Sequence, residues 1–173
     1  MNSKLNLYPT SPIDAATFRQ GMAHLAAAVN VITTVGAEGK AGFTASAVCS
    51  ITDQPATLLV CLNRSASVFS HFKNNQVLCV NTLAQQHAKL SQLFASKTPM
   101  SERFTTAQWH RLRTGAPVLK DALVAFDCVI TERHSVGSHD ILICQVQAMQ
   151  QGHADQALIY FNRSYCEPVP MSP

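Results

Sequence analysis

The sequence predicts a mainly β protein, built as an antiparallel barrel with flanking helices. Short runs rich in β-branched and apolar residues recur along the chain, and most are separated by turns too short to hold a crossover helix. Hairpin spacing with few helices favours antiparallel pairing over a doubly wound fold. The 173 residues contain no internal repeat and no low-complexity linker, which indicates one domain over 1–173 with a loose tail at 1–10.

A helix is expected to open the ordered part of the chain. Ser11 suits the N-cap, Pro12 the first helical position, and Asp14 the positive end of the helix dipole. The apolar residues that follow keep the spacing of one helical face: Phe18, Met22, Leu25 and Val29.

The rest of the pattern alternates strands with short helices. Strands are expected at 29–35, 42–52, 56–63, 76–83, 123–134, 140–149 and 157–161. Helices are expected at 65–75, with Ser65 as cap, and at 85–95. The polar segment 96–117 holds the only tryptophan, Trp109, which we interpret as an anchor for that segment.

Composition narrows the class of protein and its partners. Hydrophobic residues make up 47% and charged residues 13%, so part of the surface is expected to be covered in a homodimer. A net charge of +3 without a cluster of Lys and Arg argues against nucleic acid. No apolar run reaches the roughly 18 residues of a membrane span. The amino terminus lacks an apolar signal segment, which favours the cytoplasm.

Cysteine and histidine spacing gives no metal site. The six cysteines are widely spread and mostly lie in apolar strand-like runs, so they are expected to be free thiols. The seven histidines are scattered, and only His134 and His139 lie close in sequence. The chain also lacks a G-x-G-x-x-G motif after a strand, so a nucleotide site would not be of the Rossmann type.

One stretch combines strand alternation with unusually small polar side chains. GFTASAVCSIT, residues 42–52, carries hydroxyl and thiol groups at Thr44, Ser46, Cys49, Ser50 and Thr52. Such side chains fill a core poorly but allow a flat ligand to approach the backbone. The alternative from the local sequence is a partly solvated edge strand whose polar residues face water.

Several segments in order resemble the short-chain flavin reductases with an FMN-binding split barrel. They are FRQGMAHLAAAVNVITT, GFTASAVCSIT, CLN followed by serine, SERF, APVLK, VGSHDILICQV and LIYFNRSY. The similarity extends from about Phe18 to Tyr165 and is closest to the reductase component of 4-hydroxyphenylacetate 3-monooxygenase. It implies a dimeric enzyme that uses NADH, or NADPH, to reduce FMN or FAD for a separate oxygenase component.

The resemblance implies flavin contacts along the first strands. It places the isoalloxazine ring and ribityl phosphate beside Thr44, Ala45, Ser46, Ala47, Val48, Cys49 and Ser50. Asn30 and Val31 match lining positions of the first strand, although core packing explains them nearly as well. Asn63 and Ser65, with Ser67 as a further candidate, match the phosphate-side loop, although Ser65 could simply cap its own helix. Asn81 lies in an apolar run and needs partners if it is buried, which a ligand could supply.

His139 is the expected nicotinamide-side and catalytic residue. It lies in VGSHD, where many relatives carry Gly-Asp-His, but this chain has Ser138 in place of that aspartate. The substitution leaves the orientation and charge of the imidazole open, and His139 could instead be an ordinary turn residue.

The remaining candidates lie nearer the carboxyl terminus. Phe104 could cover the site, and Arg163 could pair with a flavin or dinucleotide phosphate. Tyr160 and Tyr165 come from the same LIYFNRSY segment, with barrel lining as the other interpretation of Tyr160.

Hydride transfer from nicotinamide C4 to flavin N5 requires stacking of two rings and no general base. The rival hypotheses are an oxidase with tightly bound FMN, acting for example on a pyridoxamine-like amine, and a non-catalytic flavin- or haem-binding module.

Overall fold

The computed structural model describes residues 12–169, which are organised around a seven-stranded sheet. The strand order is β3-β2-β6-β9-β10-β5-β4, and every neighbouring pair is antiparallel. Its strands are β2 (Asn30–Gly36), β3 (Gly39–Ala45), β4 (Val48–Asp53), β5 (Ala56–Asn63), β6 (Val77–Thr82), β9 (Val124–Val136) and β10 (His139–Gln151). The predicted mainly antiparallel β class is therefore confirmed.

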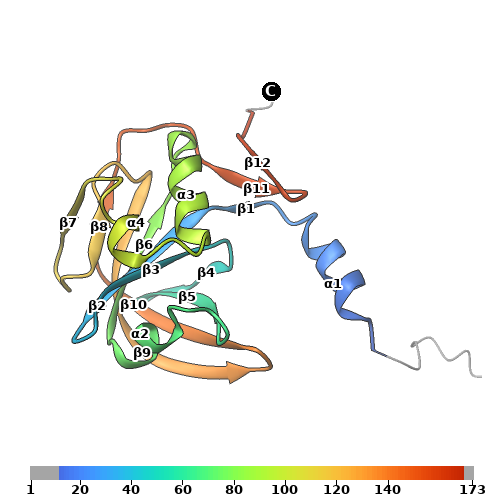
Figure 1. Cartoon of the computed structure of the whole chain (residues 1–173), viewed down its shortest axis with the longest axis horizontal. Helices are drawn as coiled ribbons and strands as arrows, with labels where there is room; N and C mark the ends of the chain where they lie inside the picture. The colour runs from blue at the N-terminus through green and yellow to red at the C-terminus, as the bar shows by residue number, and fades with distance from the viewer. Residues whose placement is uncertain (1–11, 170–173) are drawn as a thin grey trace, which may run out of the picture.

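Smaller elements surround this sheet (Figure 1). The helices are α1 (Ala15–Met22), α2 (Phe69–Asn74), the 3-10 helix η1 (Gln85–His87), α3 (Ala88–Ala95) and α4 (Met100–Arg103). Two small sheets contain β1 (Ala27–Ala28), β11 (Ile159–Phe161) and β12 (Ser164–Cys166), and β7 (Trp109–Arg111) and β8 (Pro117–Leu119). None of the helices within 12–169 is both long and apolar enough to cross a membrane.

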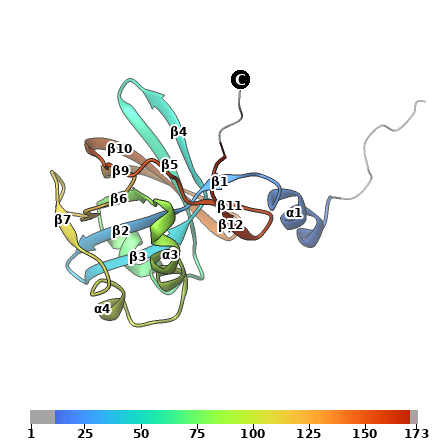
Figure 2. The same ribbon diagram turned by 90° about the horizontal axis from the view of Figure 1, so that it is seen from above.

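The sheet curves so strongly that side chains from strands near its two edges share one core, although the edge strands β3 and β4 do not pair with each other. Ile32 and Ala41, from β2 and β3, belong to the same buried cluster as Val60 of β5 and Leu142 of β10. Figure 2 shows the resulting curvature, with the β4–β5 hairpin extending away from β2 and β3. A curved sheet of this kind buries one face without needing a second sheet.

The stretch 42–52, predicted as one strand, is two strands with a break between them. β3 ends at Ala45 and pairs with β2, whereas β4 begins at Val48 and pairs with β5. These two strands are the opposite edges of the seven-stranded sheet. The chain therefore passes from one edge to the other through Ser46 and Ala47, a crossover that alternation along the sequence does not show.

The first helix differs from its prediction in both its cap and its packing. Asp14 is the N-cap, and its carboxylate accepts hydrogen bonds from the backbone N–H groups of Ala16 and Thr17, at 2.8 and 3.0 Å. The expected cap, Ser11, and the expected tail at 1–10 lie outside the described residues. The helix ends at Met22, so Val29 is not on its face and instead lies buried beside β2.

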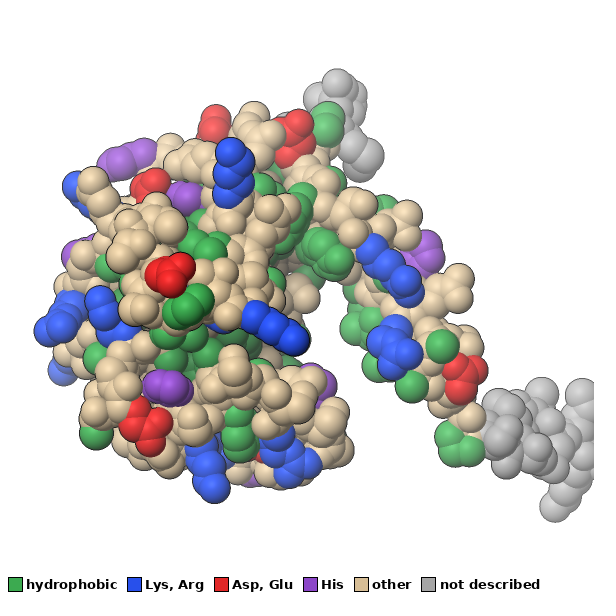
Figure 3. All heavy atoms as spheres, viewed as in Figure 1, with side chains coloured by type: hydrophobic (Ala, Val, Ile, Leu, Met, Phe, Trp, Pro, Cys, Tyr) green, Lys and Arg blue, Asp and Glu red, His purple; other side chains and the backbone are tan. Residues whose placement is uncertain are grey.

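The apolar face of α1 is exposed in the single chain. Phe18 and Met22 are 56 and 47% exposed, Leu25 just after the helix is 61% exposed, and no residue of α1 is buried. Figures 1 and 3 show α1 standing away from the barrel, with hydrophobic side chains gathered along the side that faces it. An isolated eight-residue helix is marginal in water, so this face needs a covering surface.

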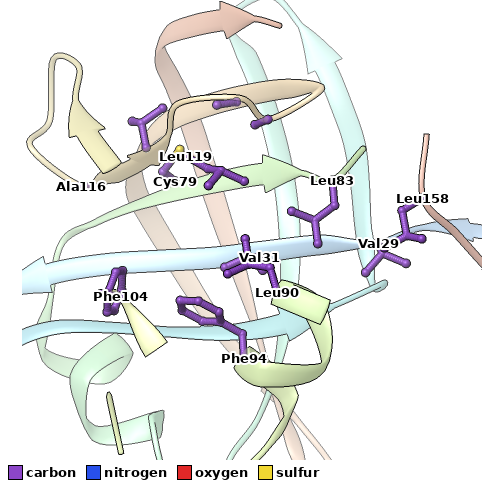
Figure 4. Packing of buried hydrophobic residues seen from close by; sticks show 13 residues of the cluster. Val29, Val31, Cys79, Leu83, Leu90, Phe94, Phe104, Ala116, Leu119 and Leu158 are labelled. Carbon is purple, nitrogen blue, oxygen red and sulfur yellow. The ribbon is translucent and has the colours of Figure 1, made fainter. Parts of the chain in front are cut away.

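A second core cluster lies between the sheet and α3 (Figure 4). Phe94 projects from α3 and packs edge-on against Phe104, with ring centroids 5.2 Å apart. Trp109 contacts both rings, at 5.7 Å from Phe94 and 5.0 Å from Phe104. Trp109 thus holds β7 against this core, which agrees with its interpretation as an anchor.

Arg103 joins three parts of this region through its guanidinium. It is buried and donates to the carbonyl oxygens of Gly42, Phe94, Ser96 and Thr98. Burial lowers the pKa of Arg103 from its usual value. The side chain therefore ties the end of α3 and the loop after it to β3.

Candidate functional site

A cleft of about 760 Å³ lies at the Ser46–Ala47 connection, where β3 ends and β4 begins. One wall is formed by Ser46, Ala47, Val48 and Cys49, and the neighbouring strand β5 adds Leu59 and Cys61. The segment from α1 to β1 and the β11–β12 hairpin close the other sides. The volume is in the range typical of small-molecule sites, and the side chains of the first wall are small.

The break also leaves backbone donors at the cleft. The carbonyl oxygen of Ala47 accepts from the N–H of Cys61 at 3.1 Å, and that of Ser46 accepts from Val48 at 3.0 Å. Within 12–169, the backbone N–H groups of Ser46 and Ala47 donate to no other protein group. These two N–H groups can therefore donate to a ligand that lies against the small side chains.

The β11–β12 hairpin brings Tyr160 and Arg163 into the cleft. Its turn residues Asn162 and Arg163 have φ angles of 47° and 62°. Positive φ at both central residues is the usual conformation of a two-residue hairpin turn, and it sets how this turn presents Arg163. The backbone N–H of Asn162 donates to the carbonyl of Ala23 at 2.7 Å, so the turn that carries Arg163 is fastened to the end of α1.

A hydrogen-bond network behind the cleft fixes its walls relative to one another. Thr44 donates through Oγ1 to the carbonyl oxygen of Ser91, at 2.6 Å. The hydroxyl of Ser91 lies 2.8 Å from that of Tyr165, whose ring packs edge-on against Tyr160 with centroids 5.7 Å apart. Thr44 and Tyr165, both predicted flavin contacts, thus connect β3 to the hairpin through α3.

Asn30 and Ala45 lie at the end of the paired region of β2 and β3. The Asn30 amide donates to the carbonyl oxygens of Ala28 and Ala45, and its Oδ1 accepts from Thr82 Oγ1 at 2.8 Å. This side chain therefore holds the backbone just before the break, and its amide is already used by protein groups.

A second group of predicted residues gathers at the far end of β5. His139 is the register partner of Asn63. The Asn63 Oδ1 accepts from the Ser65 backbone N–H at 2.9 Å and from its hydroxyl at 2.8 Å. Ser65 is thus held by Asn63 and does not cap α2, whose N-cap is Val68. Asn63, Ser65 and His139 are all exposed at the same end of the sheet.

Ser138 stands beside the imidazole of His139. Its hydroxyl oxygen lies 2.9 Å from His139 Nδ1. A hydroxyl can donate to or accept from the ring, so this contact orients the imidazole without supplying a negative charge.

Of the eighteen predicted contacts, six line the cleft: Ser46, Ala47, Val48, Cys49, Tyr160 and Arg163. The other twelve do not, and five of these lie in the core or on other surfaces. Val31 is fully buried in the core, and Phe104, only 8% exposed, packs between Phe94 and Trp109 and so does not cover the site. Ser50 is exposed on the edge strand β4, and Ser67 is exposed before α2. For Ser50, the alternative of a partly solvated edge strand fits the structure.

Asn81 also has its partners within the protein. Its amide donates to Val31 O at 3.0 Å and Thr33 Oγ1 at 3.2 Å, and its Oδ1 accepts from the Leu119 backbone N–H at 2.7 Å. Asn81 has no exposed surface and its hydrogen bonds are made to protein groups, so it does not need a ligand as a partner.

Sequence reasoning missed the residues that only tertiary structure brings to the site. Arg19, Met22 and Leu25 line the cleft from the α1 side, and Leu59 and Cys61 line it from β5. The only sequence signal for Arg19 was a basic residue on a helix of otherwise apolar character.

A larger cleft of about 1910 Å³, near η1, β7 and the end of β10, contains no predicted site residue. There His87 Nε2 lies 3.1 Å from Asp121 Oδ2, and His87 Nδ1 accepts from the Ala84 backbone N–H at 3.2 Å. Burial raises the pKa of Asp121, but its hydrogen bond and charge interaction with His87 outweigh this, and the pKa falls below its usual value.

Residues 22–168 match the flavin reductase like domain, which covers most of the chain. The chain belongs to the flavin reductase family. The resemblance to the flavin reductases is therefore confirmed, whereas the nearer likeness to the reductase of 4-hydroxyphenylacetate 3-monooxygenase stays a prediction.

Two proteins named FMN reductase (NADH) RutF are similar to this chain over most of its length. FMN reductase (NADH) RutF from Acinetobacter baylyi is 64% identical over 156 residues, which is 90% of this chain and 83% of that protein. The protein of the same name from Serratia proteamaculans is 58% identical over 153 residues, 88% of this chain and 87% of the other.

Solved flavin reductases share the fold. A structure from Haemophilus somnus 129pt, provisionally named flavin reductase, is 51% identical, has a TM-score of 0.88 and covers 90% of this chain and 100% of that one. The flavin reductase PheA2 has a TM-score of 0.82 at 28% identity, over 91% of this chain and 100% of the other. The expectation of a split barrel is confirmed by these neighbours.

The cleft residues of this flavin reductase fit a flavin. Small side chains at Ser46, Ala47 and Cys49 leave room for a flat ring, and two free backbone N–H groups can meet the polar edge of that ring. Arg19 and Arg163 supply positive charge at the cleft, which suits an anionic phosphate.

Proposed function

We propose that this chain is an NADH-dependent flavin reductase that acts on free FMN, with FAD and NADPH as alternative substrates. The observation that carries this proposal is the cleft between β3 and β4. It is lined by small side chains, by Ser46 and Ala47 with their unpaired backbone N–H groups, and by Arg19 and Arg163. The names of the RutF relatives, FMN reductase (NADH), support the choice of FMN and NADH.

The protein's part in the reaction is to bind the flavin and the nicotinamide and to orient their rings. When both are bound, the nicotinamide would supply a hydride from C4 and the flavin would take it up at N5. The N–H groups of Ser46 and Ala47 would donate to the carbonyl edge of the ring and stabilise the negative charge that reduction adds. Val48, Cys49 and Leu59 would exclude water from one side of it. Tyr160, supported by Tyr165, would limit its movement.

The nicotinamide would lie toward the group formed by Asn63, Ser65 and His139. In this arrangement His139 contacts the nicotinamide, and Ser138 keeps the imidazole oriented. The Asn63–Ser65 turn offers hydroxyl and amide groups to a phosphate at the same end of β5.

The proposal extends to the assembly and the partner. One domain spanning the chain would act as a cytoplasmic homodimer, with a second copy covering the apolar face of α1. Reduced flavin would diffuse to a separate flavin-dependent oxygenase. The sequence resemblance suggests 4-hydroxyphenylacetate 3-monooxygenase as that partner, whereas the names of the RutF relatives do not mention it.

Ser46→Trp tests the role of the cleft. The indole would occupy the space assigned to the ring, so the Kd for FMN, measured by flavin fluorescence, should rise by about tenfold or more. NADH consumption should fall at limiting FMN, while the circular dichroism melting curve stays close to that of the parent.

Ser101→Trp, on the exposed surface of α4, is the matched control and should change neither quantity. An unchanged affinity in Ser46→Trp would contradict the proposed site. Purified protein that keeps FMN through dialysis and does not oxidise NADH would instead support a binding module.

A further inference from the structure

Arg64 lies between the two residues of the Asn63–Ser65 turn and reaches across to the turn that carries His139. Its backbone N–H donates to the carbonyl oxygen of Ser138 at 3.0 Å. Its guanidinium Nη2 donates to the carbonyl oxygen of Gly137, and its Nε lies 3.9 Å from the carboxylate of Asp140. Arg64 therefore contacts the two residues before His139, Gly137 and Ser138, and the residue after it, Asp140.

Asp140 gives this contact a fixed counter-charge. Its side chain is 12% exposed, and Oδ1 also accepts from the hydroxyl of Ser135 at 2.8 Å. Because neighbouring residues of a strand point to opposite faces, Asp140 points inward while His139 points outward. The carboxylate thus holds Arg64 from behind the turn and does not compete for the imidazole.

The strands on either side of the β9–β10 turn are held by pairing of His139 with Val136 and Asn63, but the turn residues themselves have few other restraints. Gly137 has a φ of 55°, and Ser138 beside it is exposed. A Gly-Ser turn at the tip of a long hairpin has many accessible conformations when nothing holds its carbonyl groups. Arg64 holds two of them.

We propose that Arg64 is a positioning residue for hydride transfer, which fixes the β9–β10 turn and thereby sets the place of His139. The residue before His139 is Ser138, and the carboxylate follows the histidine, at Asp140. The Arg64–Asp140 pair restrains the turn from its inner side. This inference rests on the proposed function of His139 at the nicotinamide.

The test uses the full chain with Arg64→Met, Arg64→Lys and Asp140→Asn. Arg64→Met should raise the KM for NADH by about tenfold, the size of one lost charge-assisted hydrogen bond, and leave the Kd for FMN within about twofold. Hydrogen exchange of the amides at 135–140 should become faster without any ligand present.

The other two variants separate charge from geometry. Arg64→Lys keeps a cation for Asp140 but lacks the planar fork, so it should recover only part of the KM. Asp140→Asn keeps an acceptor for Ser135 and loses the charge, so it should give an intermediate effect on exchange and on KM. Arg111→Met, at an exposed arginine of β7, is the matched control and should resemble the parent.

Three results would overturn the inference. They are an unchanged KM for NADH, a raised KM with unchanged exchange at 135–140, and a parallel loss of FMN and NADH binding with a lowered melting temperature. Failure of the proposed function gives a different result, in which His139→Ala leaves NADH kinetics unchanged. The exchange measurement needs no dinucleotide and therefore distinguishes the two.

Discussion

The six cysteines have the same side chain but differ widely in their surroundings. Cys79, Cys128 and Cys144 are buried in the two core clusters, whereas Cys49 and Cys166 are exposed. Burial raises the pKa of Cys144 to about 12, and it raises those of Cys79 and Cys128 as well. Burial also raises the pKa of Cys61, at the cleft. Since the thiolate is the reactive form, these thiols should differ in reactivity.

Alkylation with iodoacetamide at pH 8, followed by mass spectrometry, should label Cys49 and Cys166 first and Cys61 more slowly. Cys79, Cys128 and Cys144 should stay unlabelled until denaturant is added. Because a raised pKa keeps a thiol protonated, labelling of Cys144 should not increase between pH 7 and pH 9.

Bound FMN should protect Cys49, which lines the cleft, but not Cys166, which serves as the internal control. Equal labelling of Cys49 with and without FMN would count against the proposed cleft. Rapid labelling of Cys144 in the native protein would contradict its burial.

At the scale of elements, Asn81 connects three strands that are distant in sequence. It lies on β6 and bonds to Val31 and Thr33 of β2 and to Leu119 of β8. A buried polar group is stable in a core only when its hydrogen bonds are made, and here they are all made to protein.

Asn81→Leu should lower the free energy of unfolding by about 2–4 kcal/mol, because it leaves the Leu119 N–H without a partner in the interior. Urea denaturation followed by circular dichroism measures this. FMN affinity of the folded protein should be unchanged, as Asn81 does not contact the cleft. Asn74→Leu, on the exposed side of α2, is the control and should cost far less. A stable Asn81→Leu protein that fails to bind FMN would restore the ligand role expected from the sequence.

At the scale of the whole molecule, α1 lines the cleft and carries apolar side chains that stay largely exposed. Arg19 and Met22 line the cleft, and Phe18 is more than half exposed. A short helix without buried residues cannot be stable through its own hydrogen bonds alone. If a second copy covers this face, dimerisation and the shape of the cleft are coupled.

Phe18→Asp should therefore shift the protein toward monomer in sedimentation velocity experiments at micromolar concentration. Its FMN affinity should fall together with dimer content, because α1 forms part of the cleft. Gln20→Asp adds the same charge on the other side of α1 and should leave the dimer intact. A parent protein that sediments as a monomer would exclude the dimer. It would also contradict the expectation of a dimer drawn from the low share of charged residues.

The sequence alone determined most strands, the helix at 85–95 and the family. Strand periods and turn residues are local signals, and the family motifs lie in order along the chain, so both can be recognised without three-dimensional contacts. Within the stretch of small side chains at 44–50, residues 46–49 line the cleft, and their role as flavin contacts stays a prediction.

Tertiary structure decided which of these residues meet. The split of 42–52 into two edge strands depends on pairing with β2 and β5, and the inward place of Phe104 depends on Phe94 and Trp109. The contact of Arg64 with Gly137, Ser138 and Asp140 joins positions more than seventy residues apart. Side-chain burial and hydrogen-bond partners across such separations arise only when the barrel closes, because no local pattern specifies them.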